Sequence, residues 1–290
     1  MFAGSGYAAE NTAAIPDFTG IWERNLIHYE PPPSGPGPIV NKMHKSDGTM
    51  DQNAWVGDYT SPILKPEAAE AVKKRGEIAL SGMTAPDPHN QCRPEPPPFT
   101  VITQFAIQML QQKDEVVLLY QGDHKVRHIR MNVPHPARVT PTWLGDSVGH
   151  YEDDTLVIDT IGLKVGPLSM VDLYGTPYSA ALHVIERYRL IDGEAAADAQ
   201  RKHDKNYRVA DMPNPLNPYG GLQIDPDTKK KGLQVEITVD DPGMFTVPWS
   251  GLVTYRRAMG EWPETVCAEN TREYYANKDT ASPVAAKPDF

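Results

Sequence analysis

The stretch that decides the fold lies in the middle of the chain, where residues 114–132 read DEVVLLYQGDHKVRHIRMN, residues 155–161 read TLVIDTI and residues 183–191 read HVIERYRLI. β-Branched and aromatic residues are frequent in all three, and turn-forming residues bound them, which is typical of β-strands. No helical segment of roughly 10–15 residues separates these strands, so we expect antiparallel connections rather than strand–helix–strand units.

The same pattern continues outward from this centre. It predicts strands at residues 18–28, 100–108, 115–120, 125–132, 149–151, 155–161, 183–191, 233–238 and 251–257. A curved antiparallel sheet closed into a β-barrel is the preferred architecture, with a β-sandwich as the alternative. One helix is predicted, at residues 65–80, because Pro66 stands in its first turn and Gly82 follows its end.

We expect one β-rich domain over residues 17–278. Residues 1–16 and 279–290 have the composition of a disordered arm and tail. The chain contains 28 prolines and 22 glycines, which predict many turns and extended loops. Residues 192–232 are polar, small and turn-forming, and an insertion of this length is either an ordered lid or a disordered segment.

Charge and hydrophobicity exclude two classes of partner. The net charge of −10 argues against nucleic acid, because phosphate binding needs a basic surface. No apolar stretch approaches the ~20 residues of a transmembrane helix. The N-terminus lacks a complete signal peptide, so we expect a periplasmic or secreted protein if an export signal has been removed, and a cytoplasmic one otherwise.

The two cysteines, Cys92 and Cys267, form no Cys-x-x-Cys motif, which excludes structural zinc and thioredoxin-type chemistry. One long-range disulfide and two buried free thiols are both compatible with the sequence.

Five segments resemble a large bacterial family of exported β-rich proteins with a PDLSGVW-type start and a GDSxGHWEGDTLVVDT-type core. They are PDFTGIWE at 16–23, WLGDSVGHYEDDTLVIDT at 143–160, LHVIERYRLID at 182–192, DDPGMFTVPW at 240–249 and ETVCAEN at 264–270. Gly20 and Trp22 also have the Gly-x-Trp form found at the start of lipocalin-like barrels. The resemblance implies a lipocalin-like barrel and favours a disulfide, because the matching cysteines commonly occur together in the family. It implies no general activity.

This chain departs from the family at two places. It carries the insertion at 192–232 where the family has a short turn, and it has Tyr151, Glu152, Asp153 and Asp154 where the family has Trp-Glu-Gly-Asp. The insertion is therefore where we expect specificity peculiar to this protein.

Polar residues on apolar strands are the candidates for chemistry, because the motifs of common nucleophiles, metalloproteases and nucleotide-binding loops are absent. We therefore expect no cofactor. Arg127 shares a strand face with Ile129 and Met131, so its guanidinium should point inward and need a carboxylate or an anionic ligand. Asp159 is the expected partner, in a structural ion pair or a substrate anchor.

The strand at 183–191 places His183 on one face and Glu186 with Tyr188 on the other, so at most one of these faces lines a cavity. His183 and His150 are the candidate general acids or bases, because imidazole titrates near neutrality. Each is also compatible with a structural role.

His124, His128 and His135 lie close in sequence but match no metal-ligand spacing, so we expect no metal. Trp143, Tyr151 and Trp249 could stack on a ligand ring at a barrel rim. The alternatives are a tight turn at residues 143–152 and a core position for Trp249.

Two functions remain open. The first is a cofactor-independent acid/base enzyme, of the lyase, isomerase or dehydratase type, which holds a small apolar or aromatic substrate in the barrel. The second is a protein that binds a small hydrophobic ligand there without turnover. A packed barrel that acts through its surface is a third reading. The expected partner is a small molecule, and self-association stays open.

Overall fold

The computed structural model of this chain describes residues 15–24, 27–43, 47, 49–50, 55–103, 105–207 and 221–262. The predicted tail, most of the predicted arm and Cys267 lie outside the described residues. The pairing of Cys92 with Cys267 therefore stays a prediction.

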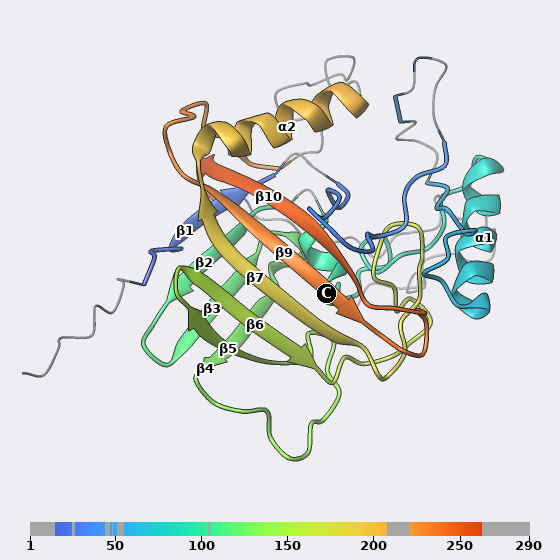
Figure 1. Ribbon diagram of the computed structural model, residues 1–290, viewed down its shortest axis with the longest axis horizontal. Coiled ribbons are helices and arrows are strands. Elements are labelled where there is room, and N and C mark those ends of the chain that lie inside the picture. The colour runs from blue at the N-terminus through green and yellow to red at the C-terminus, as the bar shows by residue number, and fades with distance from the viewer. Residues whose placement is uncertain are drawn as a thin grey trace, which may run out of the picture.

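Nine strands of the described chain close into a β-barrel (Figure 1). They are β1 (Gly20–Glu23), β2 (Ile107–Gln111), β3 (Glu115–Tyr120), β4 (Val126–Met131), β5 (Asp146–Glu152), β6 (Thr155–Ile161), β7 (His183–Ile191), β9 (Gly232–Asp240) and β10 (Trp249–Met259). The sheet closes where β1 pairs with β10, with Trp22 opposite Arg257. A tenth strand, β8 (Gln223–Ile224), extends the sheet beside the end of β10. The expected mainly β barrel is confirmed, and closure excludes the sandwich.

One pairing departs from the antiparallel expectation. β4 and β5 run parallel, with Ile129 opposite Ser147, whereas the other pairings of the sheet are antiparallel. Parallel neighbours need a crossover of about a dozen residues or more. Residues 132–145 provide it and form the long loop at the lower edge of Figure 1. The barrel is thus mixed, and it remains compatible with a lipocalin-like fold.

The interior of the barrel is filled by inward-facing side chains. Alternate residues of β3, β6, β7, β9 and β10 are fully buried, as period-two strands require. They include Leu118, Tyr120, Leu156, Ile158, Val184, Tyr188, Val235, Ile237, Val253 and Tyr255. At the closing strands, the Arg257 guanidinium lies over the Trp22 ring, 3.7 Å from its centroid.

Two α-helices are found in the described chain. The predicted helix is confirmed as α1 (Pro66–Leu80), which lies to one side of the barrel (Figure 1). The second, α2 (Gly193–Tyr207), lies in the predicted insertion and packs against β9 and β10. Ala196 and Ala197 of α2 are buried. Residues 193–207 of the insertion are therefore an ordered helix, whereas residues 208–220 lie outside the described residues.

Two further short helices complete the elements: η1 (Phe99–Val101) and η2 (Gly122–His124). The strand expected at 100–108 is thus a 3₁₀ turn followed by β2, because the proline-rich segment before it bends back and the Thr100 amide donates to the Pro96 carbonyl. None of the described helices is long and apolar enough to cross a membrane.

Candidate functional site

Arg127 points into the barrel, as its strand pattern predicted. Its side chain is 1% exposed, and its Nη2 lies 2.5 Å from Glu186 Oε2. Nε donates to the Ser147 hydroxyl at 3.0 Å, and Nη2 also donates to the Thr160 hydroxyl at 2.6 Å. The guanidinium is therefore held by a carboxylate on β7 and hydroxyls on β5 and β6.

The expected pairing of Arg127 with Asp159 is wrong. Asp159 lies on the outer face of β6, because Thr160 takes the inward position beside it. On β7, Glu186 and Tyr188 occupy the inward face, and the Tyr188 hydroxyl donates to Glu186 Oε1 at 2.9 Å. Burial acts to lower the pKa of Arg127, but the charge and hydrogen bond of Glu186, together with Tyr120 and Tyr188, outweigh it and raise the pKa. These groups form a satisfied ion pair inside a filled barrel.

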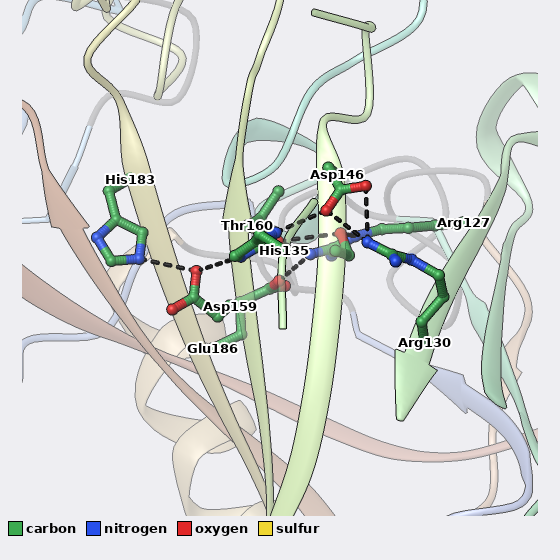
Figure 2. Close-up of polar contacts among 9 residues, drawn as sticks. Arg127, Arg130, His135, Asp146, Asp159, Thr160, His183 and Glu186 are labelled. Atoms are coloured by element: carbon green, nitrogen blue, oxygen red, sulfur yellow. Dashed lines mark hydrogen bonds and ion pairs between the residues drawn. The ribbon is translucent and has the colours of Figure 1, made fainter. Parts of the chain in front are cut away.

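A row of basic and acidic side chains lies on the outer face of strands β4 to β7 (Figure 2). His183 Nε2 lies 2.8 Å from Asp159 Oδ1, and His135 Nε2 lies 3.1 Å from the same oxygen. His135 Nδ1 lies 2.6 Å from Asp146 Oδ1, which also accepts from Arg130 Nη2 at 2.7 Å. We call these five residues the outer-face cluster.

The parallel crossover builds this cluster. Residues 132–145 leave β4 and cross to β5, and they lay His135 between Asp146 on β5 and Asp159 on β6. Each ring nitrogen of His135 therefore faces a carboxylate oxygen. Basic side chains and carboxylates alternate along the cluster from Arg130 to His183.

His183 is the accessible end of the cluster. Its side chain is 36% exposed, and within the described part of the chain its Nδ1 has no hydrogen-bond partner. The hydrogen bond to Asp159 raises the pKa of His183. Burial acts to raise the pKa of Asp159, but the hydrogen bonds from His183 and His135 outweigh it and lower the pKa. An imidazole oriented by a carboxylate on one nitrogen can exchange a proton at the other.

The second candidate base, His150, lies apart from this cluster. Its Nε2 lies 2.9 Å from Glu152 Oε1, and its side chain is 50% exposed. Arg187 binds the other oxygen of Glu152 at 2.5 Å. His150 therefore belongs to a separate surface ion network.

The predicted aromatic wall does not assemble either. Trp249 is buried in the core between the rings of Tyr29 and Phe245. The Tyr151 hydroxyl accepts from Gln111 Nε2 at 3.0 Å. Trp143 is covered by the Lys164 ammonium, 4.8 Å from the ring centroid. These three residues contact different neighbours.

Of the histidines considered for a metal, His128 contacts Glu115 and His135 contacts Asp146 and Asp159. One group in the described chain has metal-ligand spacing: the ligand atoms of His89, Glu95 and Asp123 lie within 4.8 Å of one another. The buried Lys125 ammonium lies 2.8 Å from Glu95 and 3.8 Å from Asp123. Lys125 supplies the positive charge there, so we assign the group as a partly buried ion cluster.

Two cavities in the described part of the chain lie outside the barrel. The smaller lies beneath α2, beside Arg24 and Gln200. The larger, of about 310 Å³, lies beside α1 and is lined in part by Trp55, Arg75 and Asp87. The sequence predictions missed these residues because Trp55 and Asp87 stand in irregular segments, where no periodicity marks a face.

His135 was also missed as a site residue. The signal that could have found it is the Pro134-His135-Pro136 run, since prolines on both sides restrict the backbone of a loop histidine. Comparisons with known proteins add no assignment: no family model, curated protein or solved structure matches this chain.

Proposed function

We propose that the protein is a cofactor-independent acid/base enzyme in which His183 transfers the proton. The observation that carries the proposal is the contact of His183 Nε2 with Asp159 Oδ1 at 2.8 Å, with the other ring nitrogen of His183 facing no protein group in the described chain. Asp159 is a positioning residue, because it holds the imidazole in one orientation and stabilises its charged form.

The remaining members of the outer-face cluster support Asp159. His135 binds the same carboxylate oxygen, and Asp146 with Arg130 holds His135 from the other side. A carboxylate held from two directions loses little entropy when a substrate arrives. Proton removal beside a carbonyl or a leaving group, as in isomerases, lyases and dehydratases, needs this kind of base and no cofactor.

The proposal places the substrate at the outer face of β6 and β7. The barrel interior offers no room beside Glu186 and Tyr188, which are both fully buried. A small apolar or aromatic molecule would approach the exposed ring of His183. The resemblance to the exported bacterial family is part of the same proposal, and it leaves the reaction open.

The test compares two histidines that each contact a carboxylate. Wild-type protein, His183→Gln and His150→Gln are incubated in D₂O with a panel of small aromatic ketones and hydroxy compounds, and proton exchange is followed by NMR. We expect exchange by the wild type, a loss of about 10²–10⁴-fold in His183→Gln, and little change in His150→Gln. Unchanged exchange in His183→Gln, or no exchange by the wild type across the panel, would contradict the proposal.

A further inference from the structure

The cavity beside α1 is separate from the outer-face cluster. It has a volume of about 310 Å³, at the lower end of the ~300–1,000 Å³ of small-molecule pockets. Its lining comes from α1, from residues 83–87 and from two loop positions: Trp55, Arg75, Ala79, Met83, Thr84, Ala85, Asp87 and Leu173. None of these residues belongs to the acid/base proposal, so the two sites can be tested independently.

Five of the eight residues that line the cavity have apolar side chains. An indole, a thioether, two methyl groups and a leucine side chain come from Trp55, Met83, Ala79, Ala85 and Leu173. Flat aromatic rings stack well on indole, and methionine adapts to their edges. The apolar part of the lining therefore suits a planar ring rather than a sugar or a nucleotide phosphate.

Trp55 packs against the ring of His28, which is part of a larger group of rings. The ring of His28 lies 5.0 Å from that of Trp55 and stacks on Tyr174 at 5.5 Å and on Tyr207 at 5.2 Å. Burial, with the charges of His203 and Arg24, lowers the pKa of His28 to about 3. The stack is thus uncharged at neutral pH. A ring held in place before a ligand arrives lowers the entropic cost of binding.

The polar part of the lining is Thr84 together with a pair of opposite charges. Arg75 Nη2 lies 3.4 Å from Asp87 Oδ2, while Nε donates to the Leu173 carbonyl at 3.0 Å. The path of the Arg75 side chain is built into the fold: a Cβ at Gly175, whose φ is +75°, would lie 2.3 Å from Arg75 Cδ. Asp87 is fixed as well, because its Oδ1 accepts from the Asn90 amide at 2.8 Å.

This pair discriminates between ligand groups. A ligand carboxylate drawn to Arg75 would meet the negative charge of Asp87, and a ligand ammonium drawn to Asp87 would meet the guanidinium. A neutral hydroxyl both donates and accepts, so it can accept from Arg75 and donate to Asp87 at the same time. The chemistry of the lining therefore favours a neutral group at this end.

We propose that the cavity binds a small neutral aromatic alcohol of the phenol type. The ring lies between Trp55 and Met83, and the hydroxyl lies at the Arg75–Asp87 pair. Binding here requires no turnover, and it stands whether or not His183 is catalytic.

The test uses 2-naphthol as the probe and 2-naphthoate as its anionic counterpart. Binding is measured by calorimetry and by the methyl signal of Met83 in protein labelled at the methionine methyl groups. Ala79→Phe fills the cavity from α1, and Lys73→Phe places the same ring at a position of that helix that is 48% exposed. We expect 2-naphthol to shift the Met83 signal, to bind at least tenfold more weakly to Ala79→Phe and equally to Lys73→Phe, and to bind more tightly than 2-naphthoate.

A second variant guards against misfolding of Ala79→Phe. Met83 is 44% exposed, so Met83→Glu should fold normally and weaken 2-naphthol binding. The proposal is overturned if 2-naphthol fails to bind up to its solubility limit, or if a folded Ala79→Phe or Met83→Glu binds it as the wild type does. Tighter binding of 2-naphthoate would overturn the assignment of a neutral ligand.

Discussion

Arg127 carries a full positive charge inside a filled barrel. Its partner, Glu186, is equally buried, and the hydroxyls of Ser147, Thr160 and Tyr188 complete the hydrogen bonds of the pair. Such a pair adds little net stability against well-packed apolar residues, but each member depends on the other.

Removing one member should therefore be worse than removing both. We expect Glu186→Gln, which leaves Arg127 uncompensated, to lower the free energy of unfolding by about 3–5 kcal/mol. Arg127→Met combined with Glu186→Leu should lose less than Glu186→Gln alone. Urea unfolding followed by circular dichroism measures both, and a larger loss in the double variant would argue against a coupled pair.

The contact of His183 with Asp159 predicts a pH-dependent contribution to stability. Because the folded state raises the pKa of His183, its contribution is complete below the unfolded value of about 6.5 and is lost as the pH rises through the folded pKa. The folded state lowers the pKa of Asp159, so the contribution of Asp159 is lost as the pH falls through that lowered pKa.

The difference in unfolding free energy between wild type and His183→Gln should accordingly be largest near pH 5–6 and smaller at pH 8. Denaturant titrations at a series of pH values measure it. His150→Gln, which alters a more exposed contact, serves as the control. A difference that grows between pH 6 and pH 8 would contradict the raised pKa.

The two-residue alternation of side chains assigned the faces within each strand. This is why Arg127 was correctly predicted to point into the barrel. The alternation does not say which face of one strand joins which face of the next, because that depends on register. Asp159 and Glu186 were both eligible partners for Arg127, and only the barrel decides between them. The cluster around His135 depends in addition on a crossover that no periodicity marks.

At the scale of elements, β3, β6 and β7 begin and end where the sequence predicted, because apolar alternation and turn residues bound them clearly. α2 was missed: its polar, alanine-rich sequence has few apolar positions, although alanine, glutamine, arginine and lysine are good helix formers. Its place is defined by tertiary contact, since Ala196 packs against Gly232 at the start of β9.

Gly232 is therefore a test of how α2 docks. A Cβ at this position would lie 2.3 Å from the Ala196 Cβ, so we expect Gly232→Ala to lower the unfolding free energy by about 1–3 kcal/mol. A Cβ at Gly166 would meet only the Trp143 ring, at 3.7 Å, so Gly166→Ala is the matched control with little expected effect. Thermal unfolding measures both, and equal shifts would indicate that α2 does not rest on β9.

At the scale of the whole molecule, one stack marks the closure of the barrel. Arg257 of β10 lies over Trp22 of β1 and donates to the Thr19 carbonyl at 2.7 Å. We expect Arg257→Ala to lower the unfolding free energy by about 1–3 kcal/mol, from the lost cation–π contact and hydrogen bond. Arg189→Ala on the exposed face of β7 should change it by less than about 0.5 kcal/mol. Similar losses in both variants, measured in guanidinium chloride, would contradict a special role for the stack.

The same closure has a consequence for biosynthesis. Thr19 and Arg257 are joined by a hydrogen bond although they stand 238 positions apart in the chain. The barrel can therefore close only after the ribosome has made nearly all of the described residues. Until then β1 and β9 each lack their β10 neighbour, and unpaired edges of this kind can join other chains. The growing polypeptide is thus exposed to self-association until β10 emerges.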